Sequence, residues 1–265
     1  MSVRPAGQRH TDTRALVTGG GQGIGLAIAE ALAAEGCRRL TIVGRDRGKL
    51  DRAAEGLRAT GASVATVAAD ISIVAECERV IAEAIAAMDG VNVLVNAAAT
   101  TERGSIENTT EEVFDRIYAI NVKGPFFLMQ GVVRHALEKG TPASILNILS
   151  TSAHGGQPFL TTYSSSKGAL AVVTRNVAHA YRRNRIRCNA ILPGWTDTPG
   201  EDAVQRQWHG ATDGWLEKAE ANQPMGQLGK PDQIALLAAY VLSPDAGIMT
   251  GALIDYDQHI LGTAG

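Results

Sequence analysis

A regular alternation of short apolar runs with longer amphipathic segments constrains the fold of this chain more than any other feature. Six apolar runs are typical of buried parallel strands and cover residues 15–17, 40–43, 64–67, 91–95, 144–149 and 186–191. The segments between them have helical periodicity; one helix face is formed by Ile24, Ala27, Ile28, Ala31 and Leu32. The sequence therefore predicts a single α/β domain, with a doubly wound parallel sheet and helices on both faces.

Composition marks the ends of this domain and one insertion. Residues 1–12 are polar and contain Pro5 and Gly7, which predicts a flexible N-terminal arm before a domain of residues 13–265. Glycines and prolines interrupt short helical patterns in residues 196–226, where we expect an insertion that covers the substrate. Thr109 and Glu112 have the spacing of a capping box and predict a helix start.

Charge and cysteine content argue against several classes of partner and cofactor. With 25 basic and 27 acidic residues the formal charge is −2, so no global field favours nucleic acid or an anionic membrane. The N-terminus has no apolar signal segment and no run approaches a membrane span, so we expect a cytoplasmic protein. Cys37, Cys77, Cys188 and the 6 histidines lack metal-ligand spacing, so we expect structural cysteines and no metal.

A glycine-rich turn, Thr18-Gly-Gly-Gly-Gln-Gly-Ile-Gly25, joins the first predicted strand to the first predicted helix. Glycines at such a junction permit a tight turn and let a pyrophosphate approach the positive end of the helix. A turn chosen only for backbone geometry is the alternative, but its place between strand and helix favours dinucleotide binding. We therefore expect cofactor contacts from Gly19, Gly21, Gln22, Gly23, Ile24 and Gly25.

Tyr163 and Lys167 are four residues apart in a segment of helical composition, so both side chains should lie on one helix face. An ammonium about 4 Å away could lower the pKa of a tyrosine from about 10 to ~7, which would make Tyr163 an effective acid and base. Ser150 ends a predicted strand, where its hydroxyl could hydrogen-bond the reacting oxygen of a substrate. Taken alone, these residues would be an exposed helix pair and a strand-end cap.

Several segments between residues 13 and 257 resemble the motifs of the short-chain dehydrogenase/reductase family and occur in the same order along the chain. Beside the glycine turn, the matching segments are Asp70, Asn96-Ala-Ala-Ala99, Asn121-Val-Lys-Gly124, Ser150, Tyr163-Ser-Ser-Ser-Lys167, Pro193-Gly-Trp-Thr-Asp-Thr198 and Met249-Thr-Gly251. The resemblance implies a Rossmann-type fold, a nicotinamide cofactor and four catalytic residues, Asn121, Ser150, Tyr163 and Lys167. In it, Lys167 lowers the pKa of Tyr163 and binds the nicotinamide ribose. Asn96-Ala-Ala-Ala99 departs from the pattern Asn-Asn-Ala-Gly that is usual in the family. We expect this difference to affect local backbone packing more than catalysis.

The resemblance also extends the expected cofactor site. Beyond the glycine turn, cofactor contacts are implied for Asp70, Ile71, Asn96, Ala97, Tyr163, Lys167, Pro193, Gly194 and Thr198. Arg45 follows the second predicted strand, where an acidic side chain would accept the 2′-hydroxyl of NAD and arginine suits the 2′-phosphate of NADP. The sequence therefore predicts a preference for NADP(H) over NAD(H), although Asp46 could move into the acidic role.

The main functional hypothesis is reversible hydride transfer between the cofactor and a secondary alcohol or its ketone. Polar candidates for the substrate pocket are Ser152, His154, Gln157 and Asp197, joined by Trp195, Trp208 and His209, and they suggest a sugar or polyol. One alternative is a 3-oxoacyl thioester reductase, in which Arg182-Arg-Asn-Arg185 could face an acidic carrier protein, although these residues also suit a solvated helix end. Another is a dinucleotide-binding sensor without turnover.

The resemblance further implies a homotetramer. We expect its interfaces to use the helices after the fourth and fifth strands and the segment Leu253–Leu261. One of these helices carries more apolar residues than one face needs, namely Phe126, Phe127, Leu128, Met129, Val132 and Val133, although a buried helix of a monomer would look similar.

Overall fold

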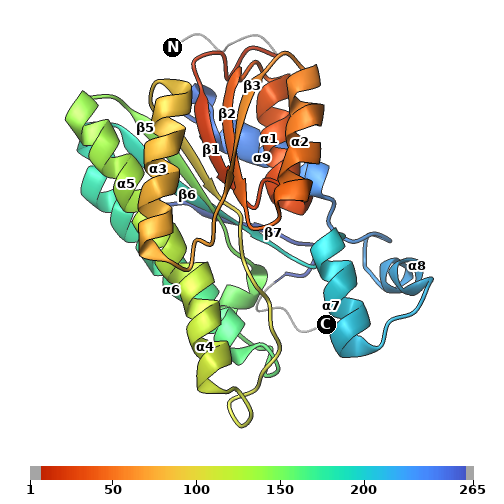
Figure 1. Cartoon of the computed structure of the whole chain (residues 1–265). Coiled ribbons are helices and arrows are strands. Elements are labelled where there is room, and N and C mark those ends of the chain that lie inside the picture. Colours follow the sequence, from red (N-terminus) through yellow and green to blue (C-terminus); the bar gives the residue numbers. More distant parts are fainter. Residues whose placement is uncertain (1–6, 261–265) are drawn as a thin grey trace.

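The computed structural model describes residues 7–260 and contains one seven-stranded sheet in the order β3-β2-β1-β4-β5-β6-β7 (Figure 1). The strands are β1 (Arg14–Thr18), β2 (Arg39–Gly44), β3 (Ser63–Ala68), β4 (Val93–Asn96), β5 (Ala143–Ile148), β6 (Ile186–Pro193) and β7 (Leu253–Tyr256). All neighbouring strands pair in parallel. The predicted doubly wound parallel sheet is confirmed.

The sequence located six of these strands and missed the seventh. The fourth run begins at Val93 rather than at residue 91, and the fifth ends at Ile148 rather than at residue 149. β7 is an edge strand of four residues that are half-buried or exposed, so it lacks the apolar run of a central strand.

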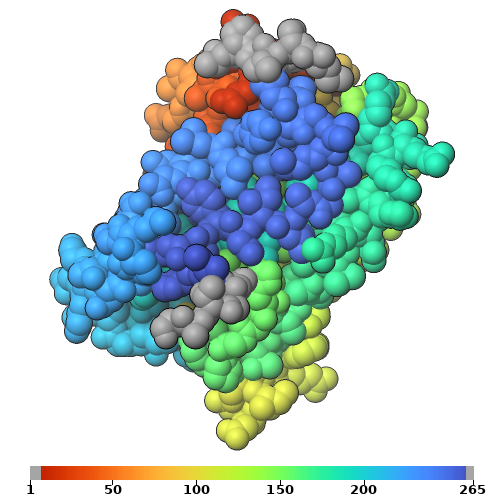
Figure 2. Space-filling model, turned by 180° about the vertical axis from the view of Figure 1, so that it is seen from behind, coloured from red at the N-terminus to blue at the C-terminus, as the bar shows by residue number. Residues whose placement is uncertain are grey.

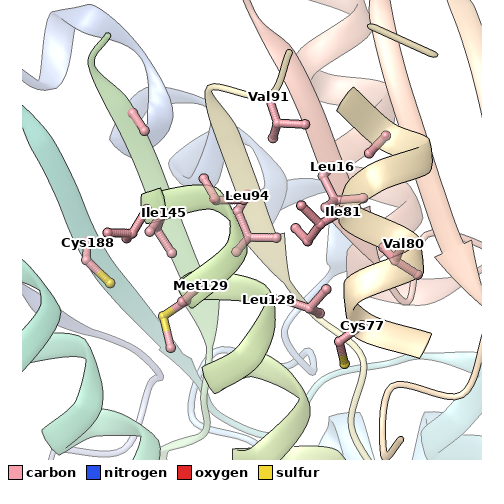
Figure 3. Close-up of a cluster of buried hydrophobic side chains, with 14 of the residues drawn as sticks. Leu16, Cys77, Val80, Ile81, Val91, Leu94, Leu128, Met129, Ile145 and Cys188 are labelled. Carbon is pink, nitrogen blue, oxygen red and sulfur yellow. The ribbon is translucent and has the colours of Figure 1, made fainter. Parts of the chain in front are cut away.

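Helices cover both faces of the sheet (Figure 1). On one face lie α1 (Gly23–Ala34), α2 (Arg47–Ala59) and α9 (Pro231–Leu242), and on the other α3 (Val74–Met88), α5 (Gly124–Lys139) and α6 (Thr161–Tyr181), with α4 (Glu111–Tyr118) beside α6. Figure 3 shows the core of the second face, where Leu94 of the sheet lies between Ile145 of the next strand and Ile81 of α3, with Leu128 of α5 beside them. Cys77 and Cys188 are buried in this core and Cys37 in the other.

Residues 7–12, the described part of the expected N-terminal arm, contact the helices of one face. The side chain of Arg9 pairs with Glu35 of the α1 exit at 2.5 Å. His10 is fully buried, and its ring bonds the hydroxyl of Thr13 at 2.9 Å and the carbonyl of Ala239 in α9 at 2.9 Å. These contacts fasten the segment to the α1 and α9 face; residues 1–6 of the expected arm lie outside the described residues.

The insertion of residues 196–226 forms two helices, α7 (Pro199–His209) and α8 (Trp215–Ala221), which project beyond the sheet (Figure 1). Seen from behind, the dark blue segment after β7 lies against the light blue insertion (Figure 2). Hydrogen bonds support this contact: Gln258 accepts from the Met225 N–H at 2.8 Å, and the ring of His259 bonds the side chain of Gln223 at 3.1 Å.

Two local points complete the comparison with the sequence. The N-cap of α4 is Thr110, whose hydroxyl accepts the Val113 N–H, so the predicted cap at Thr109 was wrong by one residue. The hydroxyl of Thr109 instead donates to the carbonyl of Ser105 at 2.7 Å. Within residues 7–260, no helix is both long enough and apolar enough to cross a bilayer.

Candidate active site

A cavity of about 1300 Å³ lies at the carboxyl ends of the strands. The strand order reverses between β1 and β4, and doubly wound sheets bind their ligands at this point. The glycine turn and the ends of β2 and β3 line one half of the cavity, and the start of α6 and the insertion line the other. The fold thus brings the predicted cofactor and catalytic segments to one place.

The glycine turn packs so closely that side chains would not fit. A Cβ on Gly25 would lie 2.5 Å from the carbonyl oxygen of Gly19. Gly19 has a φ of +68°, and a Cβ there would lie 3.0 Å from the backbone nitrogen of Ala98. The N–H groups of Ala97 and Ala98 both donate to the Thr18 hydroxyl, at 3.1 and 3.2 Å, so the alanines of the departing motif are accommodated.

This turn fits the pyrophosphate of a dinucleotide. Gln22 is the N-cap of α1 and makes no capping bond with its side chain, so the first N–H groups of the helix have no side-chain cap. All six predicted residues of the turn line the cavity, as do Asp70, Ile71, Ala97, Pro193, Gly194 and Thr198. Thr198 caps α7 by accepting the Glu201 N–H at 3.0 Å.

Asn96 is the exception among the predicted cofactor residues. It is buried in the sheet away from the cavity, and its amide donates to Asn147 of β5 at 2.8 Å. Asn147 in turn donates to the Thr174 hydroxyl of α6 at 2.9 Å. Asn96 therefore ties the two central strands to α6 rather than contacting a ligand with its side chain.

The predicted catalytic side chains of Ser150, Tyr163 and Lys167 line the cavity together. The side chain of Ser150 acts on the Tyr163 hydroxyl and lowers its pKa, and the Ser152 hydroxyl donates to that of Ser150 at 2.8 Å. Lys167 is buried one turn further along α6, where its Nζ donates to the carbonyl of Ile148 at 2.9 Å and lies 5.6 Å from the ring centroid of Tyr163. The helical spacing was thus sufficient to place this pair.

The expected lowering of the Tyr163 pKa by Lys167 is not present. Burial raises the pKa of Tyr163 to about 12, and Glu201 adds to this, while the side chain of Ser150 and the charge of Arg103 oppose it. Burial also lowers the pKa of Lys167 to about 8. The residues of this cavity therefore keep Tyr163 protonated at neutral pH.

Asn121 lies outside the cavity lining, in a π-helical turn (Ala119–Lys123) between α4 and α5. Its side chain accepts from the Thr100 N–H at 2.9 Å and donates to the Thr100 carbonyl at 3.0 Å. It also donates to the hydroxyl of Ser166, the neighbour of Lys167, at 3.1 Å. These bonds position the strand exit at Thr100 against α6, which makes Asn121 a positioning residue.

At the β2 end of the cavity, two cations face the glycine turn. Arg45 lines the cavity and is exposed, whereas Asp46 is the N-cap of α2 and accepts the Lys49 N–H at 3.0 Å. The Lys49 Nζ donates to the side-chain oxygen of Gln22 at 2.7 Å. The ammonium of Lys49 in α2 therefore lies beside Gln22 of the glycine turn, a contact that was not predicted from the sequence.

The substrate candidates divide into two groups. Ser152, Gln157, Trp195, Trp208 and His209 line the cavity as expected. His154 and Asp197 do not line this cavity; His154 lines a neighbouring pocket together with Gln157.

Contacts elsewhere explain both exceptions. The ring of His154 bonds Asp255 of β7 at 2.8 Å. Asp197 pairs with Lys230 at 2.8 Å, and Lys230 also pairs with Glu220 of α8 at 2.7 Å. Both side chains therefore fasten surface segments instead of reaching a substrate.

Arg103, Phe159 and Glu201 also line the substrate half, and sequence reasoning missed them. None lies in a recognisable motif, and they converge only through folding. Glu201 accepts from the indole of Trp195 at 2.8 Å and from Gln205 at 2.7 Å. The described part of the chain contains no group of three or more His, Cys, Asp or Glu side chains that could hold a metal ion.

Comparisons with known proteins agree with this geometry. A family model described as enoyl-(acyl carrier protein) reductase matches residues 19–258. The chain is 32% identical over 249 residues to a galactitol 2-dehydrogenase of Agrobacterium fabrum, which covers 92% of this chain and 95% of the relative.

Solved structures are similar over almost the whole chain. A structure of actinorhodin polyketide ketoreductase with NADPH is 29% identical, with a TM-score of 0.86 and coverage of 93% of this chain and 96% of that one. A 3-ketoacyl-(acyl-carrier-protein) reductase of Brucella melitensis complexed with NADH is 32% identical, with a TM-score of 0.80 and coverage of 92% and 96%. The chain therefore belongs to the short-chain dehydrogenase/reductase family and is a nicotinamide-dependent oxidoreductase that acts on an alcohol or ketone.

Proposed function

We propose that Tyr163 transfers the proton in a reversible conversion of a secondary alcohol to a ketone. The observation that carries this proposal is that Tyr163 and Ser150 line one cavity together, with the Lys167 Nζ buried 5.6 Å from the ring centroid of Tyr163. When bound, the nicotinamide dinucleotide accepts hydride in oxidation or donates it in reduction. In reduction, the carbonyl oxygen takes the Tyr163 proton as its carbon gains hydride, which leaves Tyr163 as the tyrosinate. In oxidation, the alcohol O–H proton passes to the Tyr163 tyrosinate, which must therefore lose its proton before the alcohol reacts.

The remaining residues hold this arrangement. Ser150 presents its hydroxyl to the same oxygen, and Ser152 fixes that hydroxyl at 2.8 Å. Lys167 holds the end of β5 through the Ile148 carbonyl and contacts the nicotinamide ribose. Because the raised pKa keeps Tyr163 protonated at neutral pH, its own environment favours the donor role that carbonyl reduction needs.

The substrate in this proposal carries several hydroxyl groups, as sugars and polyols do. Ser152, Gln157 and Gln205 line the substrate half and can hydrogen-bond hydroxyl groups. The similarity to a galactitol 2-dehydrogenase supports the same class. Residues 196–226 cover this half, because α7 lines the cavity along much of its length.

A 3-oxoacyl thioester reductase is the second candidate, favoured by the similarity to the Brucella melitensis reductase. The position of the arginine cluster, which would have to face a carrier protein, argues against a thioester reductase. Arg182–Asn184 form a short turn directly before β6 begins at Ile186, so they lie at the amino end of the sheet. The cavity opens at the carboxyl ends of the strands, which is the opposite edge.

We also propose that NADP(H) is preferred and NAD(H) is the weaker cofactor. Arg45 and Lys49 supply two positive charges at the end of β2, where the adenosine ribose of a dinucleotide lies. Asp46 also lines the cavity, but its Oδ1 accepts the Lys49 N–H as the N-cap of α2, so Arg45 and Lys49 outnumber the one acidic group at this strand end.

The assembly in this proposal is a cytoplasmic homotetramer. Of the six apolar residues that suggested it, Leu128, Met129, Val132 and Val133 are buried within the chain and Phe126 is 44% exposed. Val172 of α6 and Phe114 of α4 are exposed as well, which keeps apolar surface on these helices. A monomeric mass by light scattering at micromolar concentration would remove this part of the proposal.

A substrate panel tests the function directly. The purified chain is mixed with NADP(H) or NAD(H) and with secondary alcohols, polyols, ketones and 3-oxoacyl thioesters, and nicotinamide absorbance is followed. We expect turnover of a polyol or its ketone at a higher kcat/KM than any thioester. A faster thioester would favour the second candidate, and tight cofactor binding without any turnover would favour a sensor.

A further inference from the structure

The substrate half of the cavity contains a guanidinium group without a carboxylate partner. Arg103 lines the cavity and, among residues 7–260, forms no ion pair. Its Nε donates to the ring nitrogen of His209 at 3.3 Å, and one terminal nitrogen reaches the Thr101 carbonyl at 3.4 Å. Neither partner is a carboxylate and the bonds are long, so no negative charge of these two partners neutralises the guanidinium.

The fold holds Arg103 in register with the catalytic tyrosine. Gly104 forms an isolated parallel bridge with Leu160, in which its N–H donates to the Phe159 carbonyl at 2.9 Å. The Thr161 N–H donates back to the Gly104 carbonyl at 3.2 Å, directly where α6 begins. Because Tyr163 lies in the first turn of α6, this bridge fixes the backbone of Arg103 relative to the reacting hydroxyl.

Packing also fixes the head of the side chain. The guanidinium carbon lies 5.7 Å from the ring centroid of Phe159, and that ring meets the imidazole of His209 edge to face at 6.5 Å. Arg103 therefore joins a loop after β4, the approach to α6 and the last turn of α7. The positive field of Arg103 also lowers the pKa of Tyr163, so the charge acts on the reacting hydroxyl.

The carboxylates near this half of the cavity are already engaged. Glu102, next in sequence to Arg103, points to Arg116 and accepts two bonds of 2.6 Å from it. Glu201 accepts from Trp195 and Gln205. Asp257 accepts from the N–H groups after it, at Gln258 and His259. Arg103 is thus the positively charged side chain of the substrate half that has no carboxylate partner and is available to an anionic ligand.

We propose that Arg103 binds an anionic oxygen group of the substrate, so that among hydroxylated substrates the site prefers those that carry a carboxylate or a phosphate over neutral polyols. This inference rests on the proposed alcohol-to-ketone reaction and assigns the substrate class of that site. The guanidinium forms charge-assisted hydrogen bonds to the anion, while Tyr163 and Ser150 face the carbinol carbon at the other end of the molecule. Gln157 and Gln205 contact the hydroxyl groups between them.

The test uses pairs of compounds that differ only in the anionic group. Gluconate against sorbitol and 3-hydroxybutyrate against 2-butanol probe a carboxylate, and sorbitol 6-phosphate against sorbitol probes a phosphate. We expect the anionic member of at least one pair to have a kcat/KM at least tenfold higher. Arg103→Met should remove that advantage, lowering kcat/KM for the anion by about tenfold to a hundredfold, mainly through KM, and for the neutral member by less than threefold. Arg103→Lys should restore part of it.

Two control variants separate ligand binding from structural effects. Arg206→Met removes one positive charge from the outer side of α7, where Arg206 pairs with Asp202 and Asp213 outside the cavity lining, and should leave the preference for the anion unchanged. His209→Phe removes the imidazole that Arg103 contacts. If Arg103 served only to hold α7 through His209, this variant would reproduce the effect of Arg103→Met.

Calorimetry with the cofactor-loaded protein and the same pairs decides the question independently of turnover. Tighter binding of an anionic member, lost in Arg103→Met, supports the inference even where no compound is turned over, an outcome that would contradict the proposed reaction alone. Equal binding and turnover of both members in every pair would overturn the inference. Equal losses for anionic and neutral members in Arg103→Met would also overturn it.

Discussion

The two halves of the cavity are built by different means. In the cofactor half, glycine geometry, strand ends and the start of α1 make the site, and these features are written in short stretches of sequence. In the substrate half, contacts such as those of Arg103 with Phe159 and His209 join segments separated by 56 and 106 residues, respectively. In the cofactor half, a residue can be replaced only where the backbone leaves room for the new side chain. In the substrate half, the exchange of side chains can change which ligand is bound.

The largest effect is expected at the junction of the two halves. Tyr163→Phe removes the proton donor and little volume, so kcat should fall by at least about a hundredfold while cofactor affinity stays within twofold. Steady-state rates and fluorescence titration of the cofactor measure the two quantities. Retention of a tenth of the wild-type kcat would show that another group transfers the proton.

Lys167 carries a stability cost that depends on pH. Its pKa is lowered from 10.5 to about 8 by burial, so below pH 8 the folded protein holds a disfavoured ammonium and is less stable by about 3 kcal/mol. This cost shrinks as pH rises through 8 and is gone above 10.5. Lys167→Met should therefore gain stability relative to wild type at pH 6 to 7 and lose that relative gain at high pH. A difference in unfolding free energy that is constant from pH 6 to 10.5 would contradict the burial of a charged group.

In the cofactor half, the addition of one methyl group to a glycine should already destabilise the turn. Gly25→Ala places a Cβ 2.5 Å from the Gly19 carbonyl, so the turn must shift, at a cost of about 1–3 kcal/mol in unfolding free energy and with weaker cofactor binding. Gly56→Ala in α2 is the matched control, because its Cβ meets nothing within 4 Å and should stabilise the helix by about 0.5–1 kcal/mol. Chemical denaturation and cofactor titration of both variants measure the two effects. Similar changes in stability and cofactor affinity for Gly25→Ala and Gly56→Ala would contradict this prediction.

Cofactor choice should respond to side chains within the cofactor half. Arg45→Ala and Lys49→Met should each weaken binding of 2′,5′-ADP by about tenfold, the loss of one charge-assisted hydrogen bond, and change binding of 5′-AMP by less than twofold. Arg47→Ala is the control, because Arg47 pairs with Asp51 outside the cavity lining. Calorimetry distinguishes the outcomes; equal losses for both nucleotides, or a wild-type preference for NADH, would end the NADP(H) proposal.

The smallest effect is expected at His154. Its ring bonds Asp255 on an exposed surface, and such pairs contribute about 1 kcal/mol or less. His154→Ala should therefore leave kcat/KM within twofold of wild type. A large loss of activity, with the Tm unchanged, would return His154 to the substrate site.

The same contrast explains how far the sequence predicted the structure. Apolar runs and helical patterns, together with family motifs, located six strands and the turn around Gly19 and Gly25, because local sequence determines these features. Asn96 matched its motif, yet its side chain faces Asn147 within the sheet, since a motif does not state which way a side chain points. Lys49 and Arg103 were missed because only the folded chain brings them beside Gln22 and Phe159.

Hydride transfer itself is the most direct test of the central claim. The alcohol of the panel that wild type oxidises fastest is prepared with deuterium at the carbinol carbon, and the reduced nicotinamide is isolated and examined by mass spectrometry. One deuterium per turnover should be found on the nicotinamide in wild type, and Tyr163→Phe should lower the rate without releasing deuterium to water. Deuterium in the solvent, or an absence of turnover with every alcohol and ketone tested, would contradict the account.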